Sequence, residues 1–228
     1  MSTDILWHGH SNFQISSGDV GILIDPFFSG NPACITSWKA ALKPRLVLVT
    51  HDHGDHLGDA IEICRATGAL CCCVYDTAMS LVSRGLPEQL LGPPLNIGGS
   101  GEACGVRITM TPAVHTSETG APVGFVLRLP DGGTIYHAGD TALFGDMALI
   151  GQYHAIDLAL LPIGDVFTMT AEEAAHACAL IRPRQAIPMH WGTFPFLVQN
   201  PDGFAAALER RHPATRAILL RPGEATAI

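Results

Sequence analysis

The apolar residues of this chain fall in many short runs of strand type. We predict strands at residues 5–7, 21–24, 46–49, 70–74, 106–110, 123–129, 134–137, 158–161 and 217–220. The longest apolar runs, such as 46–49 and 158–161, fall far short of the ~20 residues that a membrane-spanning helix needs. The pattern therefore predicts a protein dominated by β-sheet, with no membrane span and no membrane partner.

Helix-like stretches lie between these strands, at residues 59–66, 77–84, 171–180 and 201–210. Thr170 is a predicted N-cap with Glu173 three residues later, as in a capping box. Residues 106–137 have the pattern of three consecutive strands joined by Gly and Pro turns, which favours two stacked sheets over an alternating doubly wound sheet. We therefore predict an α/β (α+β) fold, a four-layer αββα sandwich, as a single domain over residues 1–228.

The net charge and the cysteine spacing indicate which partners and which cysteine chemistry to expect. The formal net charge is −8, and the only basic cluster is the short stretch 210–212, so a nucleic-acid partner is not expected. The seven cysteines include three in a row, Cys71, Cys72 and Cys73, and none forms a Cys-x-x-Cys pair; we expect buried, reduced thiols. The N-terminus has no pattern of an export signal, so we expect a cytoplasmic protein.

The strongest functional signal is a loop of potential metal ligands directly after the predicted strand 46–49. It contains His51, His53, Asp55 and His56 in the spacing His-x-His-x-Asp-His, just before the predicted helix 59–66. Neutral imidazoles and a carboxylate are the donors that zinc and its first-row neighbours prefer. Asp52 lies outside the ligand spacing, so its replacement should leave the metal content nearly unchanged unless Asp52 orients a neighbouring histidine.

One loop cannot close two metal shells, so further ligands are expected at the ends of later strands. Three candidates follow apolar runs, where a loop begins: His115, Asp140 and His190. Taken singly, each could instead cap a turn or lie hydrogen-bonded in the core.

As a set, these residues resemble the metallo-β-lactamase superfamily, in which a His-x-His-x-Asp-His loop is followed by a lone His, an Asp in a Gly-Asp-Thr context and a final His. Within it, the chain resembles the UPF0173 and ascorbate-6-phosphate lactonase-like metal-dependent hydrolases. The segments that carry this closer resemblance are 9–13, 23–27, 30–32, 161–169 and 187–195. The likeness covers nearly the whole chain and implies the metallo-β-lactamase fold.

The resemblance also implies a ligand set and a reaction. His51, His53 and His115 would hold one ion, Asp55, His56 and His190 a second, and Asp140 would bridge the two. Zinc is the first candidate, and Mn²⁺, Fe²⁺, Co²⁺ and Ni²⁺ suit the same donors. A hydroxide between the ions, oriented by Asp55, would attack a small ester, lactone or phosphorylated metabolite.

The sequence also suggests roles for residues around this set. His10 fits the Gly-His-Ser step of the family, and we interpret it as an exposed loop-end residue able to shuttle protons in catalysis. Asp25 and His137 are interpreted as groups that orient ligands. Whether His8 takes part in the site stays open. Four further residues resemble positions on loops rimming the pocket, with a hydrophobic anchor or helix-cap role as the alternative: Asp165, Phe167, Thr168 and Trp191.

Other functions share the metal loop. A phosphodiesterase or ribonuclease of the tRNA-processing type would use the same seven ligands, but the chain has neither a long inserted arm nor basic clusters. His53 argues against a flavodiiron protein, which has Glu there, and the chain stops too soon after His190 for a glyoxalase-type helical domain. A non-catalytic metal-binding protein remains an alternative. We expect a small-molecule substrate, and the sequence is compatible with a homo-oligomer.

Overall fold

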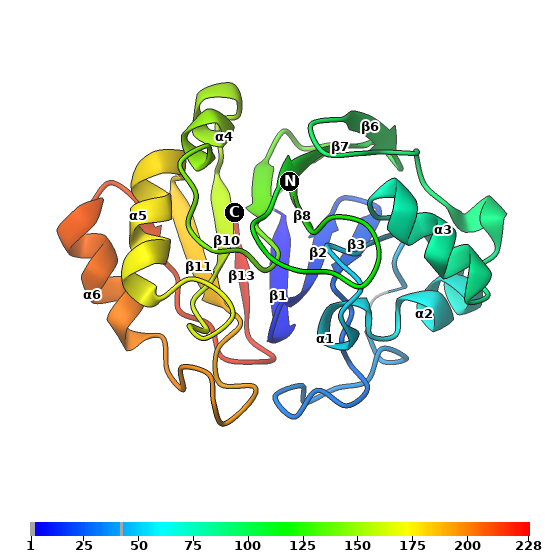
Figure 1. The fold of residues 1–228 in the computed structure, drawn as a ribbon, viewed down its shortest axis with the longest axis horizontal. Coiled ribbons are helices and arrows are strands. Elements are labelled where there is room, and N and C mark those ends of the chain that lie inside the picture. Colours follow the sequence, from blue (N-terminus) through cyan, green and yellow to red (C-terminus); the bar gives the residue numbers. More distant parts are fainter. Residues whose placement is uncertain (1–2, 42) are drawn as a thin grey trace.

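The computed structural model describes residues 3–41 and 43–228, which form two β-sheets packed face to face with helices outside them (Figure 1). The first sheet has six strands, in the order β13 (Ala225–Ala227), β1 (Asp4–Gly9), β2 (Asn12–Ser17), β3 (Val20–Ile24), β4 (Leu46–Leu48) and β5 (Leu70–Cys72). The second has seven, in the order β12 (Arg216–Ala217), β11 (Gln185–Met189), β10 (Leu158–Pro162), β9 (Thr134–His137), β8 (Val123–Arg128), β7 (Val106–Pro112) and β6 (Ser100–Ala103).

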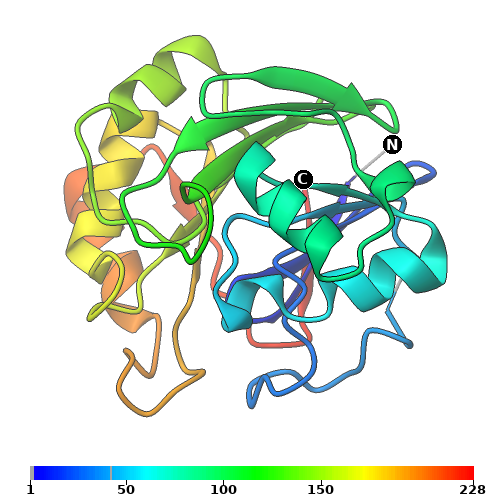
Figure 2. The same ribbon diagram turned by 45° about the vertical axis from the view of Figure 1, so that its right-hand side comes forward.

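Helices cover the outer face of each sheet, as the turned view shows (Figure 2). Those beside the first sheet are α1 (Gly54–Leu57), α2 (Ala60–Thr67) and α3 (Tyr75–Ser83), followed by the short 3₁₀ helix η1 (Glu88–Leu90). Those beside the second are α4 (Met147–Tyr153), α5 (Ala171–Ile181) and α6 (Asp202–Arg211). The predicted four-layer αββα arrangement is confirmed. Within the described residues, no helix is both long and apolar enough to cross a membrane.

The continuous apolar runs are explained by burial on both faces of a sheet. In β4, Leu46 and Leu48 point into the core between the sheets, whereas Val47 points outward to the helices of its own layer. In β10, Leu158 and Leu160 likewise face the central core, whereas Ala159 and Leu161 face the helices outside the second sheet. Strands of this kind cannot shift register by one residue without exchanging two apolar environments.

Several predicted elements are confirmed and others differ. The antiparallel strands β7, β8 and β9 match the three-strand pattern predicted at 106–137, and Thr170 and Glu173 form the capping box at the start of α5. The strand predicted at 217–220 is wrong beyond Ala217, where β12 ends. The sequence patterns missed β2, β6, β11, β13, α1 and α4. In β11 the reason is Pro188, which cannot donate to a sheet and argues against a strand by sequence alone.

Candidate metal centre

The candidate donors gather at one edge of the sandwich, where strands of both sheets end (lower edge of Figure 1). From the first sheet, the chain leaves β4 and turns into α1, which carries Asp55 and His56. From the second sheet, Asp140 follows β9 and His190 follows β11 directly. Because β9, β10 and β11 are parallel, their carboxyl ends meet at this same edge. The fold thus brings together residues about 140 positions apart in sequence.

One group of donors consists of His51, His53 and His115, whose nearest ring nitrogens all lie within 4.8 Å of one another. His51 Nε2 lies 3.0 Å from His53 Nδ1, and the ring of His115 is 5.2 Å from that of His51. Without an ion, these two nitrogens share one N–H···N hydrogen bond, whereas a cation in place of that proton would accept lone pairs from both rings.

Asp140 lies at the centre of the donors and is almost fully buried. Its Oδ2 atom is 2.9 Å from His190 Nε2, 3.2 Å from His56 Nε2 and 3.8 Å from His115 Nε2. Burial alone would raise the pKa of this carboxyl, but the neighbouring His190 and His56 hold the pKa of Asp140 well below its usual value. One carboxylate therefore touches donors from both predicted shells.

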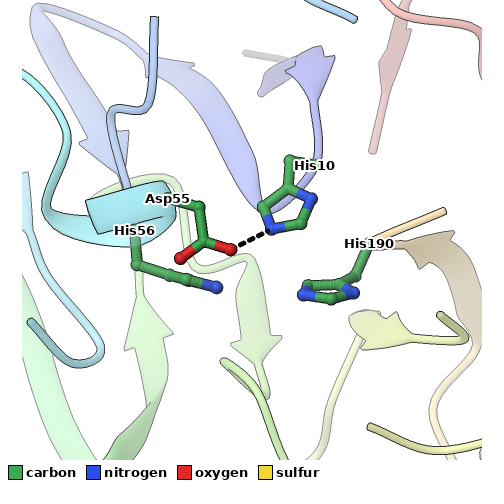
Figure 3. Close-up of side chains that lie close together, drawn as sticks. All are labelled: His10, Asp55, His56 and His190. Atoms are coloured by element: carbon green, nitrogen blue, oxygen red, sulfur yellow. Dashed lines mark hydrogen bonds and ion pairs between the residues drawn. The ribbon is translucent and has the colours of Figure 1, made fainter. Parts of the chain in front are cut away.

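A second group joins Asp55, His56 and His190 with His10 (Figure 3). The His10 side chain enters from the turn after β1, and its Nε2 atom lies 3.2 Å from Asp55 Oδ2. Its ring also stacks at a tilt on His190, with centroids 4.0 Å apart. Burial would raise the pKa of Asp55, but the hydrogen bond with His10 and the proximity of His56 bring that pKa below its usual value.

The predicted exposure of His10 is wrong, because its side chain is completely buried. Its Nδ1 atom lies 3.0 Å from Thr193 Oγ1, on the loop after β11. Burial, with help from nearby His190, lowers the pKa of His10 to about 4. His10 is thus held between Thr193 and Asp55, where it fixes the orientation of that carboxylate rather than facing solvent.

Asp25 and His137 support the donors, as the sequence suggested. Asp25 is fully buried and accepts three hydrogen bonds: from Thr50 N (2.8 Å), from Thr50 Oγ1 (2.7 Å) and, at Oδ2, from His56 Nδ1 (2.8 Å). This leaves His56 Nε2 to face the site. His137 acts on the backbone instead: its Nδ1 accepts from Gly139 N at 3.1 Å, one residue before Asp140.

Three of the residues described so far have left-handed backbone, which is uncommon for anything but glycine. The φ angles are 55° at His10, 46° at Asp25 and 62° at His190. Each such residue costs of order 1–3 kcal/mol and persists only where the surrounding structure fixes it. The left-handed backbone at these three residues turns the chain sharply at the end of a strand. The three side chains can therefore point toward the same site.

Asp52 has a role that its place outside the ligand spacing did not reveal. It is buried, and its carboxylate accepts hydrogen bonds from Ser117 Oγ (2.7 Å), Glu118 N (2.9 Å) and both Thr119 N (3.1 Å) and Thr119 Oγ1. Although burial would raise it, these bonds hold the pKa of Asp52 below its usual value. The Asp52 carboxylate therefore ties the loop of His51 and His53 to the segment that carries His115.

We expect Asp52→Asn to weaken metal binding, because Asp52 holds the segments of neighbouring histidines in place, which is the exception that the sequence left open. The side-chain NH₂ group of Asn would face N–H and O–H groups that now donate to the Asp52 carboxylate. The free energy of unfolding should therefore fall by about 1–3 kcal/mol, and the segment that carries His115 should become less firmly held. Metal titration and urea denaturation measure both effects. Asp19→Asn, at an exposed turn, is the matched control. Equal metal affinity in the two variants would contradict this role.

Other residues that the sequence singled out lie outside the donor groups. His8 is buried beside Phe28, with ring centroids 4.8 Å apart, and belongs to none of the donor groups among the described residues. Trp191 packs on Trp7 at 5.2 Å rather than rimming a pocket. Phe167 does line the cavity over the donors. The sequence interpretation did not single out Phe194 and Phe196, whose only signal was two aromatic residues in a loop that follows a predicted ligand.

Comparisons with known proteins agree with this geometry. Residues 21–191 match the model of the beta-lactamase superfamily domain. A UPF0173 metal-dependent hydrolase of Nitratidesulfovibrio vulgaris is 58% identical over 98% of this chain and 95% of its own length. One of Lawsonia intracellularis is 49% identical over 97% of each chain. Igni18, a metallo hydrolase of the archaeon Ignicoccus hospitalis, superposes with a TM-score of 0.91 at 37% identity, covering 100% of this chain and 99% of Igni18.

Proposed function

Since the chain belongs to the UPF0173 family of metal-dependent hydrolases, within the metallo-β-lactamase superfamily, we propose that it uses two divalent ions to hydrolyse a small ester, lactone or phosphorylated metabolite. The observation that supports two ions is the grouping of His and Asp donors around Asp140. Three sets, each with its ligand atoms within 4.8 Å, share members and so form one continuous centre.

The chemistry of the donors suits metal ions. Three polar atoms of this centre are buried and make no hydrogen bond within the described part of the chain: His56 Nε2, Asp140 Oδ1 and His190 Nδ1. His56 Nε2 lies 3.2 Å from Asp140 Oδ2 without making a hydrogen bond to it. Buried polar atoms that lack a hydrogen bond are costly, and a bound ion would satisfy the first two. His190 Nδ1 instead lies against the backbone of Gly164, where even a Cβ atom would come within 2.5 Å.

We assign His51, His53 and His115 to one ion and Asp55, His56 and His190 to the other, with Asp140 shared. Zinc is the first candidate for such nitrogen and oxygen donors. When bound, divalent ions polarise the substrate oxygen and lower the pKa of water toward ~7. Asp55, oriented by His10, would accept a hydrogen bond from the attacking water, and Asp25 would keep the His56 ring in place.

We expect the purified, reconstituted protein to contain close to two divalent ions per chain, because the seven assigned donors form two overlapping shells. Elemental analysis and calorimetric titration with Zn²⁺ measure the number. Saturation of the unaltered protein at one ion would contradict the two-metal assignment.

Two variants separate the shells in the same experiment. His53→Ala removes a donor assigned to the first ion only and should reduce the tightly bound metal toward one equivalent. His176→Ala, at an exposed position in α5, is the control and should keep two. A hydrolase panel of lactones, esters, phosphodiesters and sugar phosphates then tests the reaction, and failure on every class despite full metal loading would favour a non-catalytic metal-binding protein.

A further inference from the structure

A cavity of about 260 Å³ opens over the candidate metal centre. It is lined by candidate donors, among them Asp140 and His190, by Thr116, and by the apolar residues Phe167, Phe194, Phe196 and Leu197. This volume is slightly below the roughly 300–1,000 Å³ of typical ligand pockets, so the cavity suits a small substrate group. The lining of the cavity therefore combines candidate metal ligands with apolar residues.

The apolar part of this lining includes a wall of three phenyl rings, defined here as Phe167, Phe194 and Phe196. Phe194 and Phe196 are stacked with centroids 5.5 Å apart, and Phe167 meets Phe196 edge to face at 5.8 Å. Phe167 and Phe196 are 58% and 57% exposed although both are large apolar residues. When an apolar ligand covers aromatic side chains that are exposed beside a cavity, the burial of their surface favours binding.

The loop that carries Phe167 has a fixed backbone conformation. Asp165 and Val166, directly before Phe167, have φ angles of 59° and 46°, and such a backbone is a genuine outlier for a β-branched residue. The turn is closed by hydrogen bonds from Asp165 N to Met169 O (3.1 Å) and from Thr168 N to Asp165 O (2.9 Å). Strain of this kind persists where a fixed placement is needed, and here it places Phe167 at the cavity.

Cationic side chains are missing from this cavity. Among the described residues that line it there is no Lys or Arg, and the charged groups are the carboxylates Asp55 and Asp140. Three arginines lie instead in a separate groove of about 870 Å³ at the amino ends of β9, β10 and β11: Arg107, Arg128 and Arg184. Bound metal ions could neutralise a negative charge on the group that is hydrolysed. A phosphate elsewhere on the substrate would lose its hydration, and no Lys or Arg side chain lines the cavity to pair with it.

We propose that the substrate is an uncharged ester or lactone with an apolar substituent seated on the phenyl wall, and that Phe196 determines this preference. The inference rests on the proposed hydrolase function and chooses among its substrate classes. In the reaction, water adds across the acyl carbon–oxygen bond: a new C–OH bond forms, the C–O bond breaks, and the alkoxy oxygen takes the proton.

Three lactones on the zinc-loaded protein test the preference: γ-butyrolactone, γ-nonalactone with its alkyl tail, and gluconolactone 6-phosphate. We expect kcat/KM to be highest for γ-nonalactone and lowest for the phosphate. Phe196→Ala should lower kcat/KM for γ-nonalactone roughly tenfold, mainly through KM, because the apolar contact is lost. It should leave the values for γ-butyrolactone within about twofold. Tyr153→Ala removes an aromatic side chain that is 80% exposed beside the distant arginine groove, and it is the control.

A preference for the phosphorylated lactone, or an equal loss on the two uncharged lactones in Phe196→Ala, would overturn the inference. If the zinc-loaded protein hydrolyses none of the lactones or the corresponding ethyl esters, it is the proposed function that fails. Ligand-observed NMR then decides the inference separately. Saturation transfer to the alkyl tail of γ-nonalactone should occur with the unaltered protein and with Tyr153→Ala, and should be lost with Phe196→Ala; no transfer to the unaltered protein would also overturn it.

Discussion

Replacing Asp140 by Asn should reduce kcat/KM by about two orders of magnitude or more and weaken the binding of both ions together. The amide keeps the shape of the side chain but removes the negative charge, and Asp140 Oδ2 lies within 3.8 Å of nitrogens on His56, His115 and His190. No other candidate donor contacts so many of the others through one atom among the described residues. Metal content and steady-state kinetics of the same preparation measure both effects.

The control for this variant is Asp146→Asn, six positions away at the exposed start of α4. It carries the same chemical change and should keep metal and turnover. Asp140→Asn with two tightly held ions and near-normal kinetics would show that another residue bridges the ions. Loss of one ion with the other retained would place Asp140 in a single shell.

The second large effect is expected for Asp25→Asn. Asparagine tolerates the left-handed backbone that Asp25 adopts, so the change isolates the carboxylate from the turn. Because the residue is buried, Thr50 and His56 would lose a charged acceptor, and the free energy of unfolding should fall by about 3 kcal/mol. His56 would also lose its orientation, which should reduce metal affinity roughly 10–100-fold.

Chemical denaturation without metal and metal titration separate these two consequences. The exposed Asp19→Asn again provides the comparison, and should change neither quantity by more than experimental error. If Asp25→Asn keeps wild-type metal affinity, His56 must be oriented by its other contacts, above all by Asp140.

The sequence predicted that the candidate donors lie close together, because each follows an apolar run. His51, His53, Asp55 and His56 follow β4 within a few residues. His190 follows the apolar run that forms β11, although that run was not predicted to be a strand. The four layers could also be predicted, because residues 106–137 have the pattern of three consecutive strands and helix-like stretches lie between the other strands.

The rest of the site depends on contacts that no local pattern contains. The burial of His10 results from packing against Thr193, which is 183 residues away in the chain. The role of Asp52 appears only when residues 117–119 lie beside it. The phenyl wall is likewise assembled from two loops, one after β10 and one after β11.

The division of the donors between the two sheets has a consequence for folding. Neither sheet alone holds a complete set, so the centre exists only after the two sheets have packed and β1, with the turn that carries His10, lies beside the loop after β11. Contacts between such distant parts of the chain are typically formed late and slow the folding of β proteins. Metal ions would then act on the finished fold: they would retard its unfolding and raise its stability by mass action, while leaving the rate of folding largely unchanged.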